Sequence, residues 1–225
     1  MSKKFAEGMN FYKLVWVFAI FAIFGTFYEE ILEIGRQLIF EGHFGWAPRR
    51  GVFWGPFSPI YGVGSVLMLY PLTKWRTFKP WQTFCLSALI GGAFEYLAGF
   101  LQEWFMGTRS WDYSSHFLNF DGRTSLQVMI IWGILGTILV HVLWPPISRW
   151  IESWPPKLGK RLTIFLFIFL VLDCGTTIFA LIRQNYRSQG IPPITPAGQF
   201  CDDYFTDEYI HKKIPNIWGA REERK

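Results

Sequence analysis

Long apolar runs alternate along the chain with short polar connections, which is the pattern of a protein that crosses a membrane several times. The runs predict five helices, each near the roughly 20 residues needed to cross a hydrocarbon core of about 30 Å. Their approximate bounds are 11–36, 57–75, 82–105, 124–144 and 161–184. Pro56, Pro59 and Pro71 make the second run the weakest, so four spanning helices with one re-entrant segment are the alternative.

Composition strengthens this interpretation, because 51% of the residues are hydrophobic and 20% are aromatic. An ordinary soluble domain is less apolar. We therefore expect an all-α polytopic membrane protein in a lipid bilayer, with about five transmembrane helices and structured loops. The sequence divides into a transmembrane helical domain over residues 1–184 and a polar C-terminal tail over 185–225, to which it assigns no function.

Basic residues are distributed unevenly between the two sides of the predicted helices. The N-terminus and the second and fourth connections carry ten of them (Lys3, Lys4, Lys13, Lys74, Arg76, Lys79, Arg149, Lys157, Lys160, Arg161), and the other two connections carry five (Arg36, Arg49, Arg50, Arg109, Arg123). This asymmetry predicts a multi-pass protein of the cell membrane with a cytoplasmic N-terminus. It also accounts for the net charge of +5, which therefore indicates no nucleic-acid partner.

The first and third connections are rich in glycine, proline and aromatic residues. The first connection, called the first loop below, carries Gly55-Pro56 and Pro59-Ile60-Tyr61-Gly62. The third connection, called the third loop below, carries Trp111-Asp112-Tyr113. Exposed backbone polar groups are tolerated at membrane depth only against other protein or a water-filled cavity. We therefore expect two structured loops that meet on the non-cytoplasmic face.

Acidic side chains approach the same face from the helices. Glu95 and Glu103 share an i+4 stripe with Gly91 and Gly99 on the third predicted helix, and Glu29 lies near the end of the first. With Arg50, Arg109 and Arg123 as counter-charges, these glutamates predict a buried polar cluster. Such charges either bind a ligand or proton, which we favour for the deeply placed Glu95, or fasten helices and loops together.

The other candidate residues carry less information about function. Asp173 lies within the fifth predicted helix, where it is either protonated or hydrogen-bonded. The three cysteines form no C-x-x-C pair, so they suggest neither a disulfide framework nor a thiolate metal site. No cofactor is indicated, and whether the carboxylates hold a metal stays open.

Several separated motifs resemble those of bacterial membrane proteins known as ABC-transporter permeases of the CmpB type. The resemblance covers roughly residues 15–140 and rests on Gly25-x-x-x-Glu29, Arg50-Gly51, Gly55-Pro56-x-x-Pro59-Ile60-Tyr61-Gly62-x-Gly64, Phe94-Glu95-Tyr96, Glu103, Trp111-Asp112-Tyr113-Ser114 and Asn119-x-x-Gly122-Arg123. Matched position by position, it implies that the characteristic residues are Glu29, Arg50, Tyr61, Glu95, Glu103, Asp112, Asn119 and Arg123. The C-terminal tail lies outside it.

The leading hypothesis is a transporter or ABC-type permease subunit with a polar pocket for a polar or cationic solute, lined by the characteristic residues and Arg109. The chain has no G-x-x-x-x-G-K-[ST] loop, so an ABC role requires a separate ATPase subunit. A homo-oligomer is also compatible with the sequence. One alternative is a membrane enzyme that uses carboxylates, with or without a metal, on a lipid-linked or peptide substrate. The other is a structural or regulatory membrane subunit.

Overall fold

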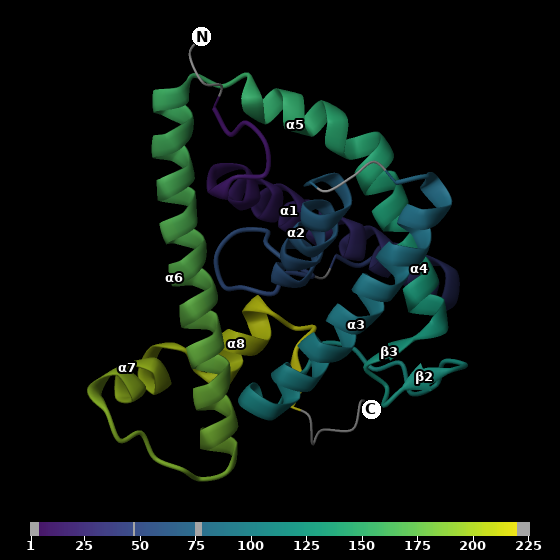
Figure 1. Ribbon diagram of the computed structural model, residues 1–225. Helices are drawn as coiled ribbons and strands as arrows, with labels where there is room; N and C mark the ends of the chain where they lie inside the picture. The colour runs from purple at the N-terminus through teal and green to yellow at the C-terminus, as the bar shows by residue number, and fades with distance from the viewer. Residues whose placement is uncertain (1–4, 47, 75–77, 220–225) are drawn as a thin grey trace.

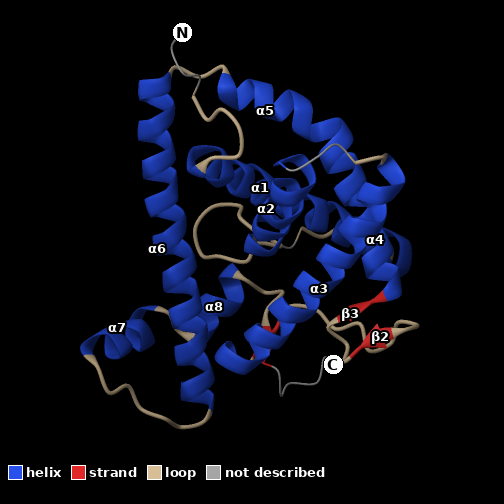
Figure 2. Ribbon diagram, viewed as in Figure 1, coloured by secondary structure: helices blue, strands red, loops and turns tan. Residues whose placement is uncertain are grey.

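The computed structural model describes residues 5–46, 48–74 and 78–219, which form a bundle of long helices with short strands between them (Figures 1 and 2). Lys3, Lys4 and Arg76, which contribute to the charge asymmetry, lie outside the described residues. The elements are, in chain order, α1 (Phe11–Arg36), the π-helical turn η1 (Gln37–Glu41), α2 (Pro59–Lys74), α3 (Pro80–Met106), β1 (Thr108–Arg109), β2 (Asn119–Phe120), β3 (Thr124–Ser125), α4 (Leu126–Ile138), the π-helical turn η2 (Leu139–Leu143), α5 (Trp144–Glu152), α6 (Pro156–Ser188), α7 (Pro196–Tyr204), α8 (Asp207–Lys213) and β4 (Trp218–Gly219).

Four of the five predicted spans coincide with helices that are long and apolar enough to cross a membrane. Within the described part of the chain these are Phe11–Glu41, Pro80–Met106, Leu126–Glu152 and Pro156–Ser188. The predicted second span instead forms α2, which has 16 residues with Pro71 inside it. At 1.5 Å per residue it is about 24 Å long, shorter than the hydrocarbon core. The expectation of an all-α polytopic membrane protein is confirmed.

Local sequence signals explain where the helices begin and end. The Asn10 side chain accepts a hydrogen bond from the backbone N–H of Lys13 at 3.0 Å, which caps the start of α1. Ser125 caps α4 through the N–H of Val128. Helix α3 begins at Pro80 and ends at Met106, and its C-cap is Gly107, whose φ of 63° is the left-handed conformation that glycine adopts readily.

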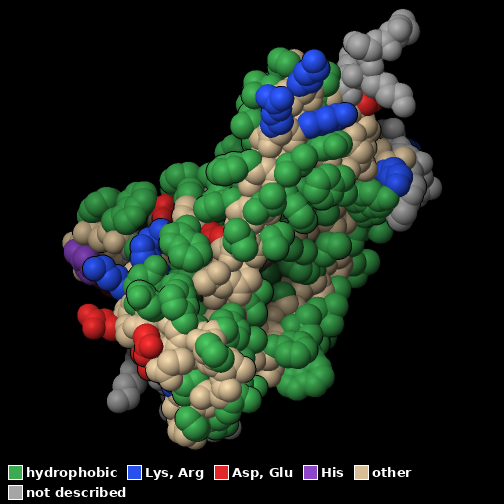
Figure 3. Space-filling model, turned by 90° about the vertical axis from the view of Figure 1, so that its left-hand side faces the viewer, with side chains coloured by type: hydrophobic (Ala, Val, Ile, Leu, Met, Phe, Trp, Pro, Cys, Tyr) green, Lys and Arg blue, Asp and Glu red, His purple; other side chains and the backbone are tan. Residues whose placement is uncertain are grey.

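The helices pack around an apolar core and present apolar side chains outward as well. The main core cluster joins α1, α2, α4 and η2 through residues that include Phe21, Leu69 and Trp132. Figure 3 shows a broad hydrophobic band on the face that includes α6, with Lys and Arg side chains above it and mixed charges below it. Phe165 and Leu172 of α6 are largely exposed. An apolar belt between charged ends matches the surface of a protein that sits in lipid.

Glycines allow α3 and α4 to approach closely. A Cβ added at Gly91 would lie 2.4 Å from the Trp132 side chain, and one at Gly133 would lie 2.7 Å from Phe84. Gly91 of α3 and Gly133 of α4 thus provide the small side chains that a close helix–helix contact requires. This contact also fixes Trp132, whose ring lies 5.8 Å from that of Tyr61.

The first loop, the third loop and the C-terminal segment meet at one end of the bundle. Arg50 Nε donates to the carbonyl of Lys213 at 3.1 Å, and β1 pairs with β4 in antiparallel register. On the other side, the N–H groups of Phe53 and Trp54 donate to Thr177 and Asp173 of α6, each at 3.2 Å. Asp173 is thus hydrogen-bonded, one of the two states expected for it, and it anchors the first loop.

Candidate functional site

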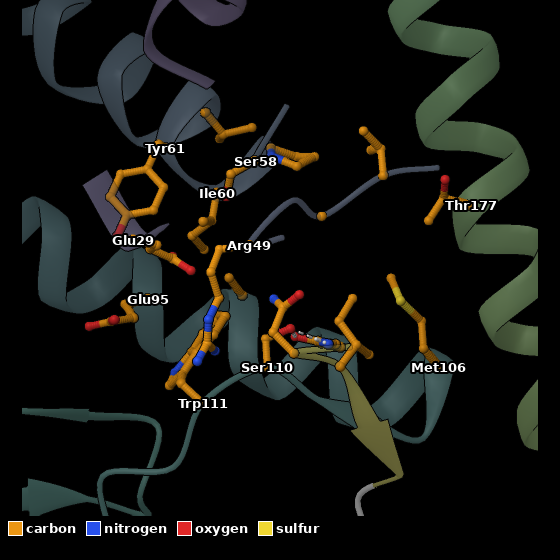
Figure 4. Close-up of a pocket in the computed structure, with 18 of the residues that line it drawn as sticks. Glu29, Arg49, Ser58, Ile60, Tyr61, Glu95, Met106, Ser110, Trp111 and Thr177 are labelled. Carbon is orange, nitrogen blue, oxygen red and sulfur yellow. Dashed lines mark hydrogen bonds between the residues drawn. The ribbon is translucent and has the colours of Figure 1, made fainter. Parts of the chain in front are cut away.

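A cavity of about 1140 Å³ lies at this end of the bundle. Its walls come from the end of α1, the first loop, the start of α2, the second half of α3, the loop after β1, and α6. In Figure 4, Glu29, Tyr61 and Glu95 lie on one side of it, and Met106 and Thr177 lie on the other. The lining contains four carboxylates and two arginines (Glu29, Glu33, Glu95, Asp112, Arg36, Arg49), so its formal charge is negative.

Glu95 projects from α3 into the aromatic side of the cavity and is only 6% exposed. Tyr113 donates its hydroxyl to Oε1 at 3.0 Å, and Thr124 donates to Oε2 at 3.1 Å. Burial, and then the charge of Glu95, raise the pKa of Tyr113 well above its ordinary value. Tyr113 therefore stays a neutral hydrogen-bond donor at any physiological pH.

Glu29 faces the same cavity from α1 and contacts the Tyr61 hydroxyl (Figure 4). Tyr61 can reach it because Gly25, one turn earlier on α1, leaves room for the tyrosine ring. A Cβ at Gly25 would lie 2.1 Å from that ring. In the described part of the chain neither Glu29 nor Glu95 forms an ion pair.

The arginine of the first loop that lines the cavity is Arg49, not Arg50. Arg49 pairs with Glu33 at 2.5 Å, and both side chains are mostly buried. Arg50, expected as a counter-charge, instead binds the carbonyl of Lys213. Sequence reasoning missed Arg49 and Glu33, although Glu33 continues the i+4 series of Gly25 and Glu29 on α1.

Glu103, Arg109 and Arg123 form a second cluster beside the cavity. Both arginines bind the one carboxylate, Arg123 Nη2 at 2.5 Å and Arg109 through Nε. Arg123 also contacts the exposed Asp121 at 3.3 Å. None of these side chains lines the large cavity, so the predicted polar cluster divides into two parts.

Two further predicted residues lie in the third loop. Asp112 lines the cavity and accepts hydrogen bonds from the backbone and side chain of Ser114. Asn119 does not line it: its Nδ2 donates to the carbonyls of Ser114 and His116, and its Oδ1 accepts from Gly122 N–H. Asn119 therefore shapes the loop that carries the cavity residues.

The C-terminal segment, which the sequence left without a role, forms part of the cavity wall. Asn216 and Ile217 line it. The segment is held against α6 by Asp202, which pairs with Arg183 at 2.6 Å and Arg187 at 2.7 Å. Two features of the sequence could have indicated this contact: the acidic residues of the tail and the two arginines near the end of α6.

No group of three histidine, cysteine, aspartate or glutamate side chains that could hold a metal ion occurs among the residues that the structure describes. The geometry instead offers a half-open chamber with aromatic residues in its walls and two carboxyls that hydroxyl groups orient. Such a chamber suits the binding of a cation or of a solute rich in hydrogen-bond donors.

Comparison with known proteins identifies the family. No curated protein and no solved structure matches the chain. A family model described as "Putative ABC-transporter type IV", of the CmpB type, matches residues 16–178, a stretch that includes Glu29, Glu95 and Glu103 and stops within α6. The chain is therefore a multi-pass membrane protein that belongs to this ABC-transporter family.

Proposed function

We propose that the chain is a membrane subunit of a transporter and that its cavity binds a cationic solute on the non-cytoplasmic side. The observation that carries the proposal is that Glu29 and Glu95 share the cavity and form no ion pair in the described part of the chain. A carboxylate removed from water without a counter-charge is costly. A bound cation supplies that counter-charge.

The position of the cavity supports the orientation. It lies beside the end of α1, whereas Lys13, Lys79 and Lys157 lie at or near the opposite ends of their helices. By the positive-inside rule that opposite end is cytoplasmic. Energy from ATP would have to come from a separate subunit, because the sequence contains no P-loop.

Cys174 offers a direct test, because this native thiol lies in α6 and lines the cavity. With Cys85 and Cys201 replaced by alanine, Cys174 in right-side-out vesicles is exposed to two membrane-impermeant methanethiosulfonates. One carries a trimethylammonium group and the other a sulfonate, and each rate is normalised to that of a small thiol in solution. We expect the cationic reagent to react about tenfold faster, since the two carboxylates of the same cavity attract it by about 1 kcal/mol or more.

Variants locate the source of that preference. Glu29→Gln and Glu95→Gln should each lower the ratio of the two rates about threefold or more. Asp121→Asn makes the same charge change on a carboxylate that lies outside the cavity and is 68% exposed, so it should leave the ratio unchanged. Equal rates in the parent protein, or a faster anionic reagent, contradict the proposal.

A further inference from the structure

The outward face of α6 has two basic residues at its start and apolar residues along its length. Gly159, Thr163 and Leu170 are buried and define the face that packs against the bundle. At about 100° per residue, the positions that point most directly away from them are 157, 161, 164, 168 and 172. The residues at these positions are all exposed: Lys157, Arg161, Ile164, Ile168 and Leu172. The same face therefore offers positive charge and apolar surface in one line.

The two basic residues have no acidic partner among the described residues. Neither Lys157 nor Arg161 forms an ion pair there. At the other end of the same helix, by contrast, Arg183 and Arg187 both pair with Asp202. Side chains four residues apart on a helix have their Cβ atoms about 5–6 Å from each other, so one anion can contact both Lys157 and Arg161.

The apolar part of this face is about as long as one lipid leaflet is deep. Arg161 and Leu172 are eleven residues apart, which is about 16 Å along a helix, and half of a hydrocarbon core of about 30 Å is about 15 Å. Figure 3 shows Lys and Arg side chains directly above the hydrophobic band, at the end of the molecule where α6 begins. A phospholipid has the same division, with a charged headgroup above apolar chains.

A second copy of the chain fits this face less well. In a membrane dimer with twofold symmetry about the bilayer normal, the same face of each copy meets the other at the same depth. Contact through this face would bring Lys157 and Arg161 against the same two residues of the partner. Like charges repel more strongly where a contact excludes water. An anionic headgroup neutralises the two cations instead.

We propose that Lys157 and Arg161 bind the headgroup of an anionic phospholipid whose acyl chain lies along Ile164, Ile168 and Leu172. The inference goes beyond the proposed function and does not depend on the cavity. It assigns different roles to the two faces of α6, since the inner face contributes to the cavity wall and the outer face holds a lipid.

Quenching by brominated lipids tests the site at a chosen position. With Cys85, Cys174 and Cys201 replaced by alanine, Phe165→Cys carries a bimane fluorophore one turn after Arg161. The protein is reconstituted into vesicles of phosphatidylcholine and phosphatidylglycerol, with the acyl chains of one or the other lipid brominated. The two degrees of quenching give the relative affinity of the lipids at this position. We expect an about fivefold preference for phosphatidylglycerol, because two basic residues attract its negative charge.

Leu89→Cys is the matched control position on another exposed helix face. Phe165 is 72% exposed and Leu89 is 60% exposed, and each lies nine residues after the first residue of its helix. One and two turns before Leu89 the same face carries Cys85 and Trp81 instead of basic residues. The preference there should be about twofold or less.

Paired variants identify the residues that bind the headgroup. Lys157→Gln with Arg161→Gln should lower the preference at position 165 to about twofold or less. Lys74→Gln with Lys79→Gln removes the same charge from two exposed lysines at the same end of the bundle, so it should leave the preference unchanged.

Four results would overturn the inference. They are equal affinities of the two lipids at position 165, equal preferences at positions 165 and 89, an unchanged preference in the Lys157→Gln, Arg161→Gln protein, and no quenching by either lipid, which would show that protein covers this face. If that paired variant has a lower Tm, the parent protein in about 1 M salt decides instead. Screening should then reduce its preference to about twofold or less, and an undiminished preference overturns the inference.

Discussion

Two groups of acidic side chains lie in the same half of the molecule and differ in what faces them. Glu103 binds Arg109 and Arg123, and this group lies beside the cavity. Glu29 and Glu95 line the cavity and bind hydroxyl groups, and Glu95 also binds the Trp132 side chain. The first group fastens α3 to the third loop by its own charges, whereas the second leaves its charge available to a ligand.

The first prediction concerns the fastening group and has the largest effect. Glu103→Gln leaves two mostly buried arginines without their shared carboxylate, so we expect a loss of about 2–3 kcal/mol in the free energy of unfolding. For a chain of this length that corresponds to a fall in Tm of roughly 5–10 °C. Tryptophan fluorescence during heating in detergent measures it.

Asp121→Asn is the matched control, because Asp121 contacts the same Arg123 but is 68% exposed. It should lower Tm by about 2 °C or less, as expected for a solvent-exposed pair. If Glu103→Gln behaves like this control, the arginines do not depend on Glu103, and the contrast between the two groups is lost.

The second prediction disturbs the cavity group through packing. Gly25→Ala places a methyl group where the Tyr61 ring lies, which should cost about 1–3 kcal/mol and move the hydroxyl away from Glu29. Gly35→Ala on the same helix meets nothing within 4 Å and should be neutral or slightly stabilising. Tm and the ratio of Cys174 rates measure both effects. An unchanged Tm in Gly25→Ala would mean that the ring has room to shift.

These contrasts show how much of the fold and of the candidate site can be predicted from the sequence. The spacing of Gly91, Glu95, Gly99 and Glu103 placed them on one face of α3, and the structure puts that face against α4, the cavity and the third loop. The sequence could not assign binding partners to the arginines, because neighbours such as Arg49 and Arg50 bind different partners once the loop backbone is folded. The role of the tail depends on contacts between residues more than 100 positions apart, which periodicity does not report.

The third prediction concerns the ion pairs that hold the C-terminal segment against α6. The hydrogen bond from Arg183, and then that from Arg187, lower the pKa of Asp202 below its ordinary value of 3.8, against the opposing effect of burial. In the undocked tail that pKa is the ordinary, higher one. The contribution of Asp202 to docking is therefore complete above the ordinary value and is lost as the pH falls through the lowered one.

Hydrogen exchange of the α7 and α8 amides, corrected for the intrinsic effect of pH, measures this docking. Acidification from neutral pH to about pH 3 should speed exchange several-fold. Asp202→Asn should show faster exchange already at neutral pH and a smaller dependence on pH, with the remainder coming from Asp207, which also pairs with Arg187. A variant with the pH dependence of the parent protein would show that Asp202 does not control docking.

The smallest effect on stability is expected from Glu95→Gln, and this prediction is the sharpest test of the comparison. The amide keeps oxygen and nitrogen near Tyr113 and Thr124 and removes a buried charge that has no described counter-charge, so the loss of one hydrogen bond and the relief of desolvation oppose each other. We expect the free energy of unfolding to change by about 0.5 kcal/mol or less. The same variant should lose much of the preference of Cys174 for the cationic reagent. If Glu95→Gln lowers Tm as far as Glu103→Gln does, Glu95 is also a fastening residue, and the cavity has lost its main candidate for binding a cation.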